Sequence, residues 1–185
     1  MQGTSPFDDT TVELQHLLQQ FYREPGGSAQ LAEFSKVSSL PSPDDVLLDH
    51  HGHMTSAMET HYREPVDVEV HRTRRNDDWY SREITLHTRH TGKAVLYAIT
   101  LLQIDALEPA VWDAIASEQI PLGRVLMNHD IVRDVRRCEL WRLRAGPNLA
   151  TLLPVSVGAT LSGRTALIRC NGRPAIGLLE ILAPV

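Results

Sequence analysis

Two charged residues interrupt apolar stretches of this sequence, and both are of types that bind small anions or transfer protons. Arg82 lies in residues 79–86, where strand alternation places it on the same side as Ile84 and Leu86. A charge on an apolar face is costly unless it is paired. The pattern therefore leaves two interpretations equally open, an arginine that binds an anionic ligand and an arginine in a structural ion pair.

Glu180 is the second such residue, because it is the only charge in the apolar run 176–182. Burial would raise the pKa of a carboxyl group in this setting, which suits a general acid or base. The structural alternative is that Glu180 is the partner of a buried arginine, with Arg82 itself as a candidate.

Two further segments are weaker candidates. The run 49–53 contains three histidines, with His61 beyond it, and histidine and aspartate are metal ligands. This run is polar and contains glycine, so a solvated loop is favoured over a metal site. Residues 121–124 begin a helix whose free N–H groups could hold an anion, although most such helix starts are only caps.

These residues must be positioned by a sheet, because the hydrophobic period in the middle and the end of the chain is that of strands. Asn171-Gly172 is a strong hairpin signal between the last two strands. Consecutive strands joined by tight turns predict an α+β domain, with a single antiparallel sheet and helices packed on one face. The expected strands are 66–70, 79–87, 95–104, one around 138–143, 165–170 and 175–182, and the expected helices begin near residues 14, 109 and 121.

Length and composition narrow the class of protein. A chain of 185 residues fits one domain, expected over residues 12–185 after a flexible N-terminus of residues 1–11. The formal net charge of −5 argues against nucleic-acid binding through a basic surface. No apolar run is long enough to span a membrane, and no signal peptide is present. The 2 cysteines have no CxxC spacing, so a cytoplasmic protein without disulfides or structural zinc is expected.

Four ordered segments, which extend from about residue 44 to the end of the chain, resemble the chorismate pyruvate-lyase family. Each motif alone is weak, and their order makes the set more specific. The segments are Leu47-Leu48 with Met54-Thr55, Trp79-x-x-Arg82-Glu83-Ile84, Ile120-Pro121-Leu122-Gly123-Arg124-x-Leu126, and Gly163-Arg164-Thr165 through Asn171-Gly172-Arg173-Pro174 to residues 179–184.

The resemblance implies an antiparallel sheet with loops closed over a buried pocket. It also implies an enzyme that cleaves chorismate to 4-hydroxybenzoate and pyruvate without a metal or organic cofactor, serving quinone or phenolic biosynthesis. Arg82 would bind the ring carboxylate and Glu180 would lie near the phenol position, both as catalytic residues. The implied substrate-binding residues are Arg82, Leu122, Met54, Gly123 and Thr55, with no metal ligand.

One departure from the family concerns the substrate. Family members carry a second arginine on the next strand, where this sequence has apolar residues near Ile99. A smaller or differently charged aromatic acid is therefore an alternative substrate. The expected partner is a small molecule rather than nucleic acid or membrane, and the expected state is a monomer or homodimer.

Two other functions are alternatives to a lyase. The first is a non-catalytic module that binds an aromatic acid, like the effector domains of some bacterial transcription regulators. It is the weaker alternative, because fewer than 50 residues precede Leu47 and they contain no helix-turn-helix pattern. The second is a metal-dependent enzyme that uses the histidine-rich run 49–53.

Overall fold

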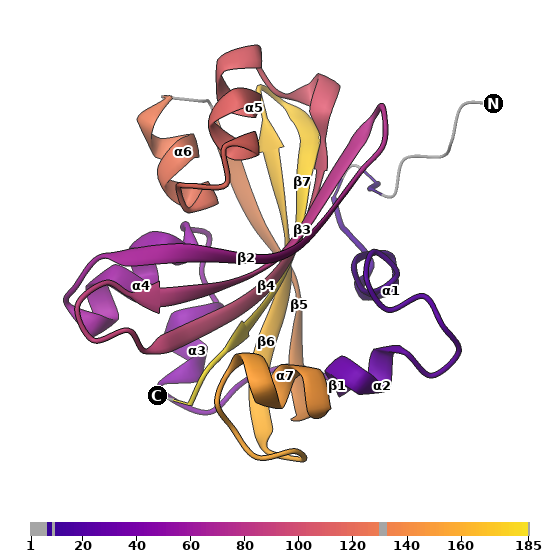
Figure 1. Ribbon diagram of the computed structural model, residues 1–185, viewed down its shortest axis with the longest axis vertical. Helices are drawn as coiled ribbons and strands as arrows, with labels where there is room; N and C mark the ends of the chain where they lie inside the picture. The colour runs from indigo at the N-terminus through magenta and orange to yellow at the C-terminus, as the bar shows by residue number, and fades with distance from the viewer. Residues whose placement is uncertain (1–6, 9, 130–132, 185) are drawn as a thin grey trace.

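The sheet organises the molecule, and a computed structural model describes it over residues 7–8, 10–129 and 133–184. Its strands pair in the order β1-β5-β6-β7-β4-β3-β2, and every pair is antiparallel (Figure 1). The predicted single antiparallel sheet and α+β class are therefore confirmed. The strands are β1 (Ala32–Val37), β2 (Val66–Arg75), β3 (Trp79–Thr88), β4 (Ala94–Gln103), β5 (Arg133–Ala145), β6 (Thr160–Cys170) and β7 (Arg173–Leu182).

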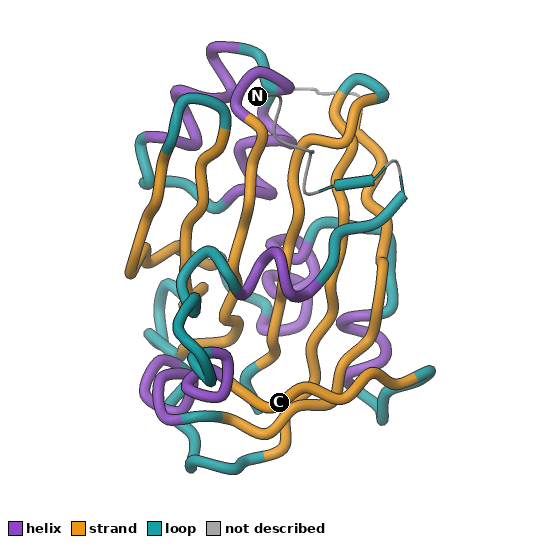
Figure 2. The backbone as a smooth tube through the Cα atoms, turned by 90° about the vertical axis from the view of Figure 1, so that its right-hand side faces the viewer, coloured by secondary structure: helices purple, strands orange, loops and turns teal. Residues whose placement is uncertain are grey.

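Helices lie on both sides of this sheet, so the expectation that they pack on one face is wrong (Figure 1). One face carries α3 (Asp44–Leu48), α4 (Met54–Tyr62), α5 (Pro109–Ala116) and α6 (Leu122–Asn128). The other face, which Figure 2 views directly, carries α1 (Leu14–Leu18), α2 (Ser28–Leu31) and α7 (Pro147–Leu152). Because β4 is buried along nearly its whole length, both of its faces need cover. A short 3-10 helix, Ile104–Ala106, follows β4.

Alternation along the central strands divides their side chains between two cores. On β4, Tyr97, Ile99 and Leu101 pack under α1 and α7, whereas Leu96 and Ala98 pack on the side of α3 and α4. Successive side chains of a strand point to opposite faces of the sheet. The same rule fixes which charged residues of β3, β6 and β7 can meet on one face.

The ends of several observed strands differ from those that the sequence predicted. β2 continues through Arg75 instead of ending at residue 70, and β6 begins at Thr160 instead of residue 165. The sequence pattern did not predict β1, α2, α4 or α7, which are short or weakly periodic. Among the described residues, no helix is long and apolar enough to cross a membrane.

The described part of the N-terminal segment packs against the sheet. Phe7 is 6% exposed, and its ring meets that of Trp79 edge to face with centroids 5.2 Å apart. Phe7 also forms an antiparallel bridge with Val12. Residues 1–6 and 9 lie outside the described residues, so the boundary expected at residue 11 stays a prediction.

Candidate functional site

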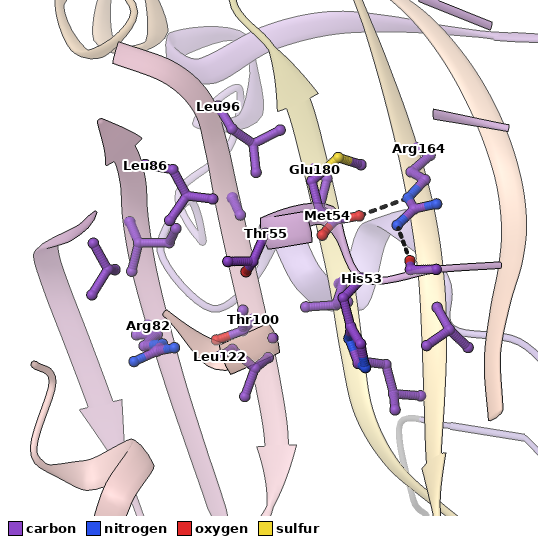
Figure 3. A pocket seen from close by; sticks show the side chains of 18 residues that line it. His53, Met54, Thr55, Arg82, Leu86, Leu96, Thr100, Leu122, Arg164 and Glu180 are labelled. Atoms are coloured by element: carbon purple, nitrogen blue, oxygen red, sulfur yellow. Dashed lines mark hydrogen bonds and ion pairs between the residues drawn. The ribbon is translucent and has the colours of Figure 1, made fainter. Parts of the chain in front are cut away.

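A pocket lies between the sheet and the first turns of α4 and α6, and all six residues expected for the site line it (Figure 3). The empty space between its walls, with the open mouth included, is about 520 Å³. Most of the wall is apolar, from side chains of β3, β4, β6 and β7. The expected residues in its lining are Met54, Thr55, Arg82, Leu122, Gly123 and Glu180.

Arg82 is a buried cation in this pocket, and none of the described residues forms an ion pair with it. It extends from β3 and is 1% exposed. Its Nε and Nη1 are buried and have no hydrogen-bond partner in the part of the chain that the structure describes. Burial lowers the pKa of this guanidinium, and the charges of Tyr80 and Glu118 oppose the shift. Of the two interpretations open from the sequence, the geometry favours an arginine that faces a ligand.

Glu180 pairs with an arginine, but the partner is Arg164 rather than Arg82. The two residues face each other across β6 and β7, and Arg164 Nε donates to Glu180 Oε2 at 2.6 Å. Their side chains are 1% and 7% exposed. Glu180 Oε1 forms no hydrogen bond with any described residue and remains available to a ligand. The structural alternative, in which Glu180 is the partner of a buried arginine, is therefore the arrangement observed, with Arg164 in place of Arg82.

Arg164 is the residue of this site that sequence reasoning missed. Besides Glu180, its Nη1 donates to the carbonyl oxygens of Leu48 at 3.0 Å and His50 at 2.8 Å, and Nη2 donates to that of Gly52 at 3.5 Å. The signal that identified Glu180 is absent around Arg164, because Gly163 and Thr165 are its neighbours and β6 contains a second arginine, Arg169. The expected strand began at residue 165, one residue too late to include it.

The position near Ile99, where family members carry a second arginine, faces away from the pocket. Ile99 belongs to the core on the opposite face of the sheet. Its neighbours Ala98 and Thr100 line the pocket instead, and Thr100 is the register partner of Arg82. The pocket does contain a second arginine, Arg164, which comes from β6 and is already committed to Glu180.

The pocket wall opposite the sheet is formed where α6 packs on α4. A Cβ added to Gly123 would lie 2.7 Å from Thr55 Oγ1, so only glycine permits this approach. Arg124 of α6 forms an ion pair with Glu59 of α4. These contacts bring Leu122 and Met54, at the starts of the two helices, into one wall. Whether the backbone N–H groups there bind a ligand stays a prediction.

Two histidines of the run 49–53 form hydrogen bonds with the backbone of the protein. His50 Nδ1 accepts from the Gly52 N–H at 2.9 Å, and His51 Nδ1 donates to the Val135 carbonyl at 3.1 Å. Burial, and then the charge of Arg164, lower the pKa of His50. Within residues 7–8, 10–129 and 133–184, no group of three or more His, Cys, Asp or Glu side chains could hold a metal ion.

Glu83 follows Arg82 on β3 but points to the opposite face, where it is fully paired. Its Oε1 accepts hydrogen bonds from the hydroxyls of Tyr22 at 2.7 Å and Tyr97 at 2.6 Å. Arg72 donates to both of its oxygens, at 2.5 and 2.9 Å. Burial alone would raise the pKa of Glu83, but these hydrogen bonds outweigh it and lower the pKa. Glu83 is therefore a structural charge.

Comparison with known proteins places the fold. No known family and no curated protein matches the sequence. The effector domain of PhnF from Mycobacterium smegmatis matches over 71% of this chain and 88% of its own, at 12% identity and a TM-score of 0.52. A longer PhnF chain matches with a TM-score of 0.51 and 12% identity over 71% of this chain, which spans 64% of it.

A third match is a domain assigned as the ligand-binding domain of a GntR-family transcriptional regulator from Bordetella bronchiseptica. It is 14% identical, covers 63% of this chain and 83% of its own, and has a TM-score of 0.48. Identities this low establish a common fold only.

These comparisons correct the expectation of a chorismate pyruvate-lyase. The two PhnF matches with TM-scores above 0.5 are described as an effector domain and a longer PhnF chain, and neither is described as a lyase, so the predicted enzyme class is wrong. The links to chorismate, 4-hydroxybenzoate, pyruvate release and quinone or phenolic biosynthesis are withdrawn with it. The fold expected from the resemblance is confirmed, and the chain has a chorismate lyase-like fold with a buried, mainly apolar pocket.

Proposed function

We propose that this chain is a non-catalytic module that binds a small aromatic acid in the pocket between its sheet and α4 and α6. The observation that carries this proposal is the guanidinium of Arg82, a buried cation whose Nε and Nη1 have no hydrogen-bond partner among the described residues. Buried donors left unpaired are costly, and arginine is the side chain best suited to bind carboxylates. A ligand carboxylate would satisfy these donors.

The rest of the pocket suits an aromatic ring. Ile84, Leu86, Leu96 and Leu178 supply an apolar wall on the sheet side. Glu180 lies beyond β4 from Arg82, and its Oε1 can accept a hydrogen bond from a ligand hydroxyl or amine. An apolar middle with a few polar groups is the usual composition of a small-molecule site. The fold shared with the PhnF effector domain is consistent with a binding module.

Titration calorimetry with 4-hydroxybenzoate tests this proposal, with 4-hydroxybenzamide as an uncharged probe of nearly the same shape. The acid is expected to bind and the amide to bind at least about tenfold more weakly, because it cannot pair with the guanidinium. Chromatography of the mixture after a long incubation is expected to recover the acid unchanged.

Two variants separate the pocket from the rest of the surface. Arg82→Met keeps an unbranched apolar side chain at the site and is expected to abolish binding of the acid. Arg89→Met is the matched control, because Arg89 is an exposed arginine directly after the end of β3 that pairs with Asp67. If Arg82→Met binds 4-hydroxybenzoate as the wild type does, or if the wild type does not distinguish acid from amide, the proposal is wrong.

A further inference from the structure

Thr100 carries an unpartnered hydroxyl beside the guanidinium of Arg82. It is 3% exposed, and its Oγ1 forms no hydrogen bond within the described ranges of the chain. Thr100 and Arg82 are register partners on β4 and β3, and both line the pocket. Directly opposed residues of an antiparallel pair have Cβ atoms about 4.5–5.5 Å apart. Two buried donors without partners therefore lie side by side at one end of the pocket (Figure 3).

Formally charged groups of the described residues line the pocket, and one of the cations has no partner among them. They are the guanidinium groups of Arg82 and Arg164 and the carboxylate of Glu180. Arg164 is committed to Glu180 and to the carbonyl oxygens of residues 48, 50 and 52. Among the described lining residues, only Arg82 is left to pair with a ligand. The pocket therefore matches one negative charge and not two.

The carboxylate of Glu118 does not replace a ligand as the partner of the Arg82 guanidinium. It lies in the connection between α5 and α6, close enough for its charge to act on Arg82. Its carboxylate, however, accepts the hydroxyl of Tyr80 at 2.8 Å, and Glu118 does not line the pocket. Its nearby charge also weakens the attraction of this end of the pocket for an anion with two charges.

We infer that Thr100 and Arg82 form one two-point anchor for a carboxylate, and that the pocket selects ligands with a single negative charge. This inference rests on the proposed function and specifies its ligand class. The hydroxyl of Thr100 donates to one carboxylate oxygen while the guanidinium binds the other. A second charge at the far end of the ligand would meet the carboxylate of Glu180 with no cation free to pair with it, and a buried unpaired charge is strongly disfavoured.

A matched pair of probes tests the charge selection. Terephthalate carries two carboxylates on one ring, and 4-carbamoylbenzoate has nearly the same size with one carboxylate replaced by an amide. Calorimetry at pH 8 keeps the carboxylates of both probes ionised. The monoanion is expected to bind at least about 100-fold more tightly than terephthalate.

Thr100→Val tests the anchor, because valine keeps the shape and removes only the hydroxyl. A hydrogen bond to a charged group accounts for about 10-fold to 100-fold in affinity, and a loss of benzoate affinity in that range is expected. Thr165→Val is the matched control. Its hydroxyl is also buried without a hydrogen-bond partner in the described structure, but Thr165 is on the opposite face of β6 from the pocket-lining Arg164.

The outcomes separate this inference from the proposed function. If Thr100→Val binds benzoate like the wild type, or loses no more affinity than Thr165→Val, the anchor is wrong. Terephthalate binding as tightly as 4-carbamoylbenzoate would overturn the charge selection while benzoate binding upheld the proposed function. A wild-type protein that binds none of the monoanions would overturn both. Unchanged urea unfolding transitions of the two valine variants verify that each is folded.

Discussion

Two buried arginines of this pocket are expected to respond to the same substitution with opposite signs. Arg82 and Arg164 are 1% and 0% exposed and lie on strands of one sheet. Arg82 has two buried nitrogens without hydrogen-bond partners in the described part of the chain, whereas Arg164 pairs with Glu180 and with backbone carbonyls. Replacing each with methionine therefore compares a binding group with a structural one.

The magnitudes follow from these contacts. Arg82→Met removes two unpartnered buried donors at about 1 kcal/mol or more each, so the ligand-free protein is expected to gain on the order of 2 kcal/mol in free energy of unfolding. For a chain of this size that gain raises the Tm by about 4–8 °C. Arg164→Met leaves the carboxylate of Glu180 buried and unpaired, which costs about 3–5 kcal/mol.

Urea denaturation of the ligand-free proteins, followed by tryptophan fluorescence, measures both changes. The assay is repeated with 4-hydroxybenzoate at about 100 times its dissociation constant, which is expected to stabilise the wild type by about 2.7 kcal/mol. Arg82→Met is expected to show no such increase. A ligand-free Arg82→Met protein less stable than the wild type by more than about 1 kcal/mol would refute the reasoning, because Arg82 would then have a structural role.

Other substitutions probe the remaining features. Glu83→Gln removes a carboxylate whose pKa is lowered in the folded protein. The wild type is therefore expected to lose stability as the pH falls from about 4.5 through this lowered pKa, and the variant is expected to lose less. Urea unfolding at a series of pH values measures the difference. Gly123→Ala forces a Cβ against Thr55 and is expected to destabilise the protein by about 1–3 kcal/mol and to weaken benzoate binding. Urea unfolding and calorimetry measure these two effects. An unchanged benzoate affinity would contradict the pocket wall described at Gly123. Gly177→Ala places a Cβ 2.7 Å from Phe7 Cε1 and is expected to increase protease cleavage near the N-terminus, and an unchanged cleavage pattern would show that Phe7 does not dock there.

The sequence was sufficient for six of the seven strands and for six of the 18 residues that line the pocket. Period-2 alternation and the Asn171-Gly172 turn identify the long strands, because these signals are local. The same alternation places Arg82 and Glu180 on pocket-facing sides of their strands. Short elements such as β1 and α2 carry too few residues to show a period, and tertiary packing determines them.

The partners of the charged residues were beyond sequence reasoning. Pairing of Glu180 with Arg164 depends on the register of β6 with β7, which a hairpin signal alone does not fix to one residue. The loop carbonyls that Arg164 binds are more than 110 positions away in the chain. The function expected from the motifs was wrong in its enzyme class, because a fold can be shared by proteins with different activities.

Adjacent residues of β3 give this protein an unusual sensitivity to insertion. Arg82 faces the pocket, and Glu83 faces the network of Tyr22, Tyr97 and Arg72 on the other side. One residue added at the start of a strand, with the rest of the strand shifted by one position, exchanges the two faces. Ser81, Glu83 and Thr85 would then face the pocket in place of Arg82, Ile84 and Leu86. A length change of one codon would thus replace the cation of this wall with a carboxylate and remove its apolar side chains, while the walls formed by the other strands stayed in place.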